Sequence, residues 1–128
     1  MKLEHLAYGS PDCPLIRLYD FTPAEAAQLL VAVTALASGE GQPVEVHGLP
    51  FVEPVGECRL DFVRRSWDRA IIHRPGACAF ECGFTAGTWD NIAGLVEPFA
   101  EGAGGFQWLA GTPGEAALLL SASASGQW

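Results

Sequence analysis

The residues of this sequence best suited to chemistry are arginines gathered around one tryptophan. Arg59, Arg64, Arg65 and Arg69 all fall in the stretch 59–69, and Trp67 stands among them. A guanidinium group carries a fixed charge and a planar fork of donors that fits a carboxylate or a phosphate. Tryptophan and arginine are also frequent anchors of protein interfaces. We therefore take these five residues as the candidate binding residues.

The arginine stretch also has a purely structural explanation. Charged side chains on an edge hairpin keep it from pairing with other chains, and Asp61 and Asp68 would neutralise part of the charge. If the stretch binds a partner, an acidic protein surface competes with a phosphate or nucleic-acid ligand. The acidic surface could be the C-terminal third of a second subunit, which has no Lys or Arg after Arg74. The net charge of −8 favours the acidic protein and disfavours nucleic acid.

His47 offers the alternative site. It stands at the end of an expected strand, and Glu45, Glu53 and Glu57 are near it in sequence. A histidine beside a carboxylate can transfer protons near neutral pH. A pocket near His47 and the loop 48–57 would thus suit an enzyme or a small-molecule-binding protein. The competing explanation is a strand-end histidine held by a hydrogen-bonding neighbour.

The four cysteines do not predict a metal site. Cys78 and Cys82 lie on an expected strand, where residues four apart are separated by roughly 13 Å, too far to share one zinc ion. We interpret them and Cys58 as small buried thiols, and expect Cys13, in an irregular segment, to be the most reactive. No catalytic or cofactor motif is recognisable in the sequence. We therefore expect no metal and no cofactor, and catalysis is not favoured.

Two strand-to-helix junctions organise the chain around these residues. Phe21-Thr22 follows an expected strand over 15–21, and Phe84-Thr85 follows another over 78–84. Thr22-Pro23-Ala24-Glu25 is a capping box with proline at the first helical position, and it predicts a helix to about residue 38, ended by Gly39. Thr85 predicts a second helix that continues to 98–101.

The first helix has too little charge for a helix that faces solvent on one side. Outside its buried stripe it carries Val31, Ala32 and Ala35, with few polar positions between them. The second helix or a second subunit would have to cover this surface. The expected buried stripe is Ala26, Leu29, Leu30, Val33, Leu36 and Ala37. We therefore expect a homodimer or another protein partner.

The remaining elements are short. Residues 1–14 predict an irregular lead-in with at most a short strand over 3–7, and residues 40–43 a turn. Strands over 58–65 and 69–74 would form an antiparallel hairpin around the turn 66–68. Further strands are expected over 44–47, 106–110 and 115–122. If the alternation is right, one face of the sheet carries Arg17, Tyr19, Arg59, Asp61 and Glu81.

The element order predicts one α+β domain over residues 1–128. Its expected form is a single antiparallel sheet of six to eight strands, with both helices packed on one face. An offset of sixty-three residues relates Phe21-Thr22 to Phe84-Thr85. This offset is compatible with a pseudo-duplicated βαββ unit that has half-repeats at 15–66 and 78–122. Helical periodicity alone would produce much of the same match.

Composition narrows the class of protein. With 49% apolar and 17% charged residues, the chain is globular rather than disordered. No apolar run is long enough to span a bilayer, and the start lacks the apolar run of a signal peptide, so we expect a cytoplasmic protein with reduced cysteines. The sequence favours a small interaction or accessory domain that self-associates. The alternatives are the His47 pocket and anion or nucleic-acid binding through the arginine stretch 59–74.

Overall fold

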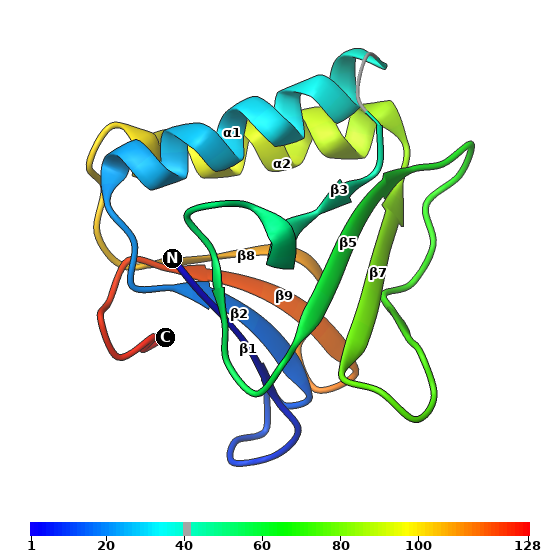
Figure 1. The fold of residues 1–128 in the computed structure, drawn as a ribbon, viewed down its shortest axis with the longest axis vertical. Coiled ribbons are helices and arrows are strands. Elements are labelled where there is room, and N and C mark those ends of the chain that lie inside the picture. The colour runs from blue at the N-terminus through cyan, green and yellow to red at the C-terminus, as the bar shows by residue number, and fades with distance from the viewer. Residues whose placement is uncertain (40–41) are drawn as a thin grey trace.

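The computed structural model describes residues 1–39 and 42–128, and it shows an α+β fold in which two helices accompany two mixed sheets (Figure 1). The helices are α1 (Pro23–Ser38) and α2 (Ala86–Ala100). Sheet A has the order β4 (Glu53–Pro54), β1 (Lys2–Leu6), β2 (Leu15–Tyr19), β9 (Ala116–Ser121) and β8 (Phe106–Thr112). Sheet B has the order β3 (Val44–Glu45), β5 (Arg59–Arg64), β7 (Ala79–Phe84) and β6 (Ile72–His73). The predicted single antiparallel sheet is therefore wrong.

The division into two sheets arises because each helix carries the chain from one sheet to the other. After β2, helix α1 leads to the antiparallel pair β3 and β5, and β5 lies parallel to β7. After β7, helix α2 leads to the antiparallel pair β8 and β9, and β9 lies parallel to β2. Each sheet thus combines the strand before one helix with the strand pair that follows the other. The two halves share this pairing scheme, and the duplication itself stays a prediction.

The helices begin where the sequence predicts. Thr22 accepts a hydrogen bond from the Glu25 N–H at 3.2 Å, and the Glu25 carboxylate accepts one from the Thr22 N–H at 2.9 Å, so the capping box is confirmed. Gly39 ends α1 with a φ of 79°, which a residue without a side chain adopts at little cost. Thr85 caps α2 and Pro98 lies in its last turn. Neither helix is long and apolar enough to cross a membrane, as far as the described residues show.

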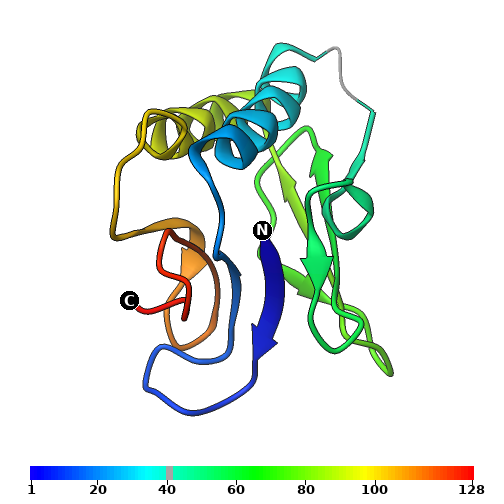
Figure 2. The same ribbon diagram turned by 60° about the vertical axis from the view of Figure 1, so that its left-hand side comes forward.

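The helices lie side by side, run in opposite directions and cover one end of the space between the sheets (Figures 1 and 2). Ala26, Leu29, Val33 and Leu36 of α1 are buried, as the expected stripe requires. Trp89 of α2 is fully buried, and its indole N–H donates to the Val63 carbonyl at 3.0 Å. One core joins both sheets and both helices, with Leu3, Leu18, Leu60, Phe62, Cys82, Ile92 and Leu120 among its members. The cover expected for α1 comes in part from α2.

Several shorter elements differ from their predicted bounds. The lead-in contains β1, a five-residue strand that pairs with β2 along its whole length. The strand expected over 44–47 ends at Glu45 and is followed by a 3₁₀ turn, η1 (Val46–Gly48). The turn predicted for residues 40–43 lies partly outside the described residues.

The predicted hairpin of residues 58–74 is also wrong. Strands β5 and β6 do not pair, because β7 lies between them, parallel to β5 and antiparallel to β6. The segment 65–71 instead crosses the carboxyl end of β7, where the Arg65 and Arg69 N–H groups donate to the carbonyls of Phe84 and Gly83. The arginines are therefore spread along sheet B instead of around a hairpin tip, and Arg59 and Arg64 lie on opposite faces of β5.

Candidate functional site

Most of the positive charge of the molecule lies on sheet B, and all of it except Arg64 lies on the outer face of that sheet. Five of the seven basic residues belong to β5 or to the segment between it and β7: Arg59, Arg64, Arg65, Arg69 and Arg74. Residues on this face of the two central strands include Asp61 and Glu81, which occupy paired positions of β5 and β7. The residues predicted to share one polar face are thus split between the two sheets, since Arg17 and Tyr19 belong to β2 of sheet A.

Glu81 is the centre of the arginine network. Its side chain is only 11% exposed, and its two carboxylate oxygens lie 3.1 and 3.2 Å from one terminal nitrogen of Arg65. Arg74 and Arg69 approach the same carboxylate at 3.6 and 3.8 Å. Arg74 also lies 3.8 Å from Asp61. One nearly buried carboxylate thus holds three arginines, which leaves the face with an excess of positive charge.

Gly83 allows two of these arginines to lie flat against β7. A Cβ atom on Gly83 would stand 2.9 Å from Cγ of Arg65 and 3.6 Å from Cδ of Arg69. The first distance is below van der Waals contact, so any side chain at this position would push Arg65 away from Glu81. The absence of a side chain is therefore part of how the arginines are held in place.

Asp68 fastens the segment 65–71 to the start of α2. Its Oδ1 accepts hydrogen bonds from the Thr85 N–H at 2.8 Å and from the Thr85 hydroxyl at 3.1 Å, and its Oδ2 accepts one from the Thr88 hydroxyl at 2.8 Å. These bonds, led by that from the Thr85 backbone, lower the pKa of Asp68 from its ordinary value. Asp68 thus anchors the backbone of the segment that carries Trp67 to the N-terminus of α2.

Four of the five predicted binding residues come together. Arg64, Arg65, Trp67 and Arg69 line, with Ser66, a hollow of about 430 Å³; we call these five residues the arginine–tryptophan patch. Trp67 is 68% exposed, although an indole is normally placed to bury its large apolar surface. An exposed indole among arginines is the composition of an interface anchor.

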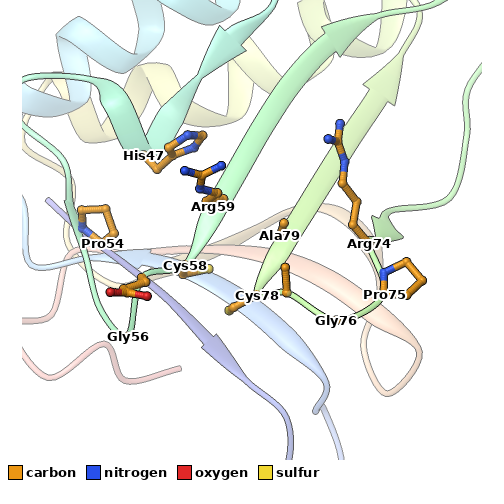
Figure 3. Close-up of a pocket in the computed structure, with 12 residues that line it drawn as sticks. His47, Pro54, Gly56, Cys58, Arg59, Arg74, Pro75, Gly76, Cys78 and Ala79 are labelled. Carbon is orange, nitrogen blue, oxygen red and sulfur yellow. The ribbon is translucent and has the colours of Figure 1, made fainter.

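Arg59 does not belong to the patch. It begins β5 at the opposite end from Arg64, and five residues of a strand span roughly 16 Å. It lies instead at a larger hollow of about 950 Å³, also lined by His47, Arg74, Cys58 and Cys78 (Figure 3). We call this hollow the Arg59 pocket. Glu57 also lines the pocket, but no carboxylate of the described residues lies within 4 Å of the Arg59 guanidinium, which leaves this group available to an anion.

His47 lies at this pocket but is held by the scaffold. Strand β3 ends at Glu45, and the His47 ring continues the pairing because its Nδ1 accepts the Leu60 N–H at 3.1 Å. Its Nε2 lies 3.5 Å from the Glu45 carboxylate. Both ring nitrogens therefore have partners within the scaffold, and a role of His47 in ligand binding stays a prediction.

The Cys58 thiol at the pocket and the Cys82 thiol in the core are poor nucleophiles. Burial, followed by a hydrogen bond with Cys78, raises the pKa of Cys58 to about 12. Burial also raises the pKa of Cys82. Only a thiolate attacks or ligates efficiently, so these groups are inert at neutral pH. No group of three metal-binding side chains comes together anywhere in residues 1–39 and 42–128.

Sequence reasoning missed how the arginines are held and how they are distributed. The signal that could have found the sheet arrangement was the unbroken apolar run Ala116–Leu120, because central parallel strands are buried on both faces and do not alternate. Once β9 and β7 are central strands, Arg59 and Arg64 must lie at opposite ends of β5.

Comparisons with known proteins add nothing to this geometry. No protein-family model matches the chain, and no curated protein or solved structure is significantly similar to it. The site alone therefore carries the functional argument.

Proposed function

We propose that this chain is a small interaction domain, without catalysis of its own, that binds an acidic partner segment through the arginine–tryptophan patch. The observation that carries the proposal is Trp67, 68% exposed on a segment that Asp68 fastens to α2. An indole has only two side-chain torsions and so loses little conformational entropy on binding, and the surrounding guanidinium groups favour carboxylates. The charge of the patch is opposite to that of the whole molecule, which directs acidic partners to this face.

The test uses a fluorescent peptide of alternating glutamate and glycine, and the same peptide with glutamine in place of glutamate. We expect the wild-type protein to bind the acidic peptide, and the binding to weaken as salt is added. Trp67→Ala should weaken the binding about tenfold or more, as for an interface anchor. Tyr8→Ala, which removes an aromatic side chain that is 87% exposed elsewhere, is the matched control. Equal binding of both peptides, or an unchanged affinity for Trp67→Ala, would overturn the proposal.

Self-association is the second part of the proposal, and Val31 is the residue through which it can be tested. Val31 of α1 is 71% exposed, and its exposed neighbours Gln28 and Thr34 carry no charge. Light scattering should give a mass that rises with concentration toward twice 13.6 kDa, and Val31→Glu should keep the monomer mass. A wild-type mass that does not change with concentration removes the dimer.

A cytoplasmic location is the third part of the proposal. It is supported by the four cysteines, all of which are free thiols. Fractionation of cells that express the full chain tests it, and recovery from an oxidising compartment contradicts it.

A second candidate function is favoured by the Arg59 pocket. Arg59 and Arg74 line the same hollow of about 950 Å³, which suits a small ligand with carboxylate or phosphate groups. Thermal-shift measurements with citrate and inorganic phosphate should show stabilisation that Arg59→Gln abolishes. His47→Ala tests the neighbouring imidazole, because an equal response of that variant would show that His47 does not contact the ligand.

A further inference from the structure

A third hollow lies at β8 of sheet A, away from the two hollows of sheet B. It has a volume of about 570 Å³ and is lined by Ser10, Asp12, Phe106, Trp108, Gln127 and Trp128. Three of these six residues are aromatic and one is a carboxylate. None of them belongs to the arginine–tryptophan patch or to the Arg59 pocket, so the hollow is a separate feature.

The aromatic residues are positioned by strand alternation and by the segment 122–128. Phe106 and Trp108 are two apart on β8 and share one face of it, and Phe106 is 47% exposed. The Trp128 indole N–H donates to Oδ2 of Asp12 at 3.0 Å. The segment leading to Trp128 is itself fixed, because Arg17 donates to the carbonyls of Ser125 and Gly126 at 3.1 and 3.0 Å. The three rings therefore line the hollow as parts of the fold.

Asp12 gives the hollow a negative charge. Its backbone N–H donates to the Ser10 hydroxyl at 3.1 Å, and its carbonyl accepts from the Gly114 N–H at 2.9 Å, so the residue is held at both ends. Its carboxylate accepts the Trp128 indole but has no Lys or Arg within 4 Å in the described ranges. Arg17, which donates to the segment leading to Trp128, forms its ion pair with Glu4.

Aromatic faces around an unpaired carboxylate select cations. The ring quadrupole attracts an ammonium or guanidinium group placed over its face, and a nearby carboxylate adds direct charge attraction. An anionic ligand would be repelled by Asp12. A neutral apolar ligand would cover that carboxylate without giving it a partner, which costs free energy. The net charge of −8 further concentrates cations at the surface.

The edge of sheet A indicates which kind of ligand carries the cation. Strand β8 is the last strand of its sheet and pairs only with β9, and its sequence Phe106–Thr112 contains no charge and no proline. Such an edge offers unpaired backbone groups to an added strand. Alternate side chains of an added strand would point to the outer face, beside Phe106 and Trp108. We propose that the Asp12–Trp128 hollow binds the arginine or lysine side chain of an extended peptide that pairs with β8.

The test follows the indole N–H signals of ¹⁵N-labelled protein by NMR. The probe is an end-blocked peptide of alternating threonine and arginine, and the control peptide carries citrulline, the neutral isostere of arginine. The Trp108 and Trp128 signals should move with the arginine peptide at about tenfold lower concentration than with the citrulline peptide. The two other tryptophans, Trp67 in the patch and Trp89 in the core, should not move and serve as internal references.

The matched variants separate charge from shape. Asp12→Asn keeps an oxygen that can accept the Trp128 indole but removes the charge, so it should lose the preference for arginine over citrulline. Trp67→Ala should bind the arginine peptide as the wild type does. Equal affinity for the two peptides in the wild-type protein, or a preference that survives Asp12→Asn with the Trp89 signal unchanged, would overturn the proposal. Either result leaves the acidic-partner proposal for sheet B untouched, because the two sites share no residue.

Discussion

Replacing Glu81 by glutamine tests whether one carboxylate holds the arginine face together. The substitution keeps the shape of the side chain and removes its charge. Glu81 is 11% exposed in its side chain and contacts Arg65 at 3.1 Å, Arg74 at 3.6 Å and Arg69 at 3.8 Å. Glutamine can accept from Arg65 with one oxygen, but its NH₂ group then faces guanidinium donors that need an acceptor.

The magnitude follows from the burial of the carboxylate and the exposure of its partners. A hydrogen bond to a charged group contributes about 1.5–3 kcal/mol when the acceptor is buried. The arginine side chains are 38–58% exposed, so water takes over part of their solvation and the two longer contacts add little. We expect Glu81→Gln to lower the free energy of unfolding by about 2 kcal/mol. For a chain of this size that is a fall of roughly 8 °C in Tm.

The assay is urea unfolding followed by tryptophan fluorescence, which changes as the buried Trp89 becomes exposed. The midpoint should fall while the m-value stays the same, because the same surface is exposed on unfolding. Glu97→Gln is the matched control, since Glu97 is exposed on α2 and makes no ion pair with a described residue. This variant should stay within about 0.5 kcal/mol of the wild type. If Glu81→Gln does the same, the carboxylate does not organise the face and the reasoning fails.

Three further predictions concern the scaffold. Thr22→Ala removes one half of the capping box and should cost about 1 kcal/mol in urea unfolding; a change below a few tenths would contradict the cap. Gly111→Ala should fail to give a stable fold by circular dichroism, because its Cβ would lie within 3 Å of the backbone of Ala116 and Ala117 at a φ of 78°; a wild-type Tm would show that β8 can shift. Hydrogen bonds lower the pKa of Asp68 in the folded state, so the unfolded state binds more protons as the solution is acidified. The ionised Asp68 carboxylate therefore stabilises the fold fully above its ordinary pKa of 3.8, and this stabilisation is lost as the pH falls through the lower folded pKa. Asp68→Asn has no such contribution to lose, so its Tm should drop less between pH 7 and pH 3 than the wild-type Tm does.

The recurring order of strand, helix and two strands explains why local features were predictable and sheet pairing was not. A strand, a threonine cap and a helix follow one another within some twenty residues, and each is specified by side chains close in sequence. The two strands after each helix could pair with the strand that precedes the same helix. They could equally pair with the strand that precedes the other helix, as they do in the structure. Both choices bury the same apolar faces, so alternation of side chains cannot distinguish them.

The candidate site shows the same limit. The structure brings Arg64, Arg65, Trp67 and Arg69 together, because they are concentrated in one short stretch of sequence, and their role in binding stays a prediction. Arg59 was grouped with them although the expected strand over 58–65 already separates it from Arg64, and the sequence could not show that Glu81 of another strand contacts the arginines. The hollow at Asp12 and Trp128 is lined by residues from both ends of the chain, and no spacing along the sequence predicts it.

The sequence by itself therefore determined both helices, their caps, the composition of the buried stripe and the gathering of arginines. Those features depend on contacts between residues a few positions apart. The tertiary structure decided that there are two sheets, that β7 separates β5 from β6, and that Glu81 holds three arginines. These outcomes depend on the free energy of packing whole elements together, in which distant strands compete for the same partner and the best-covered arrangement is the stable one.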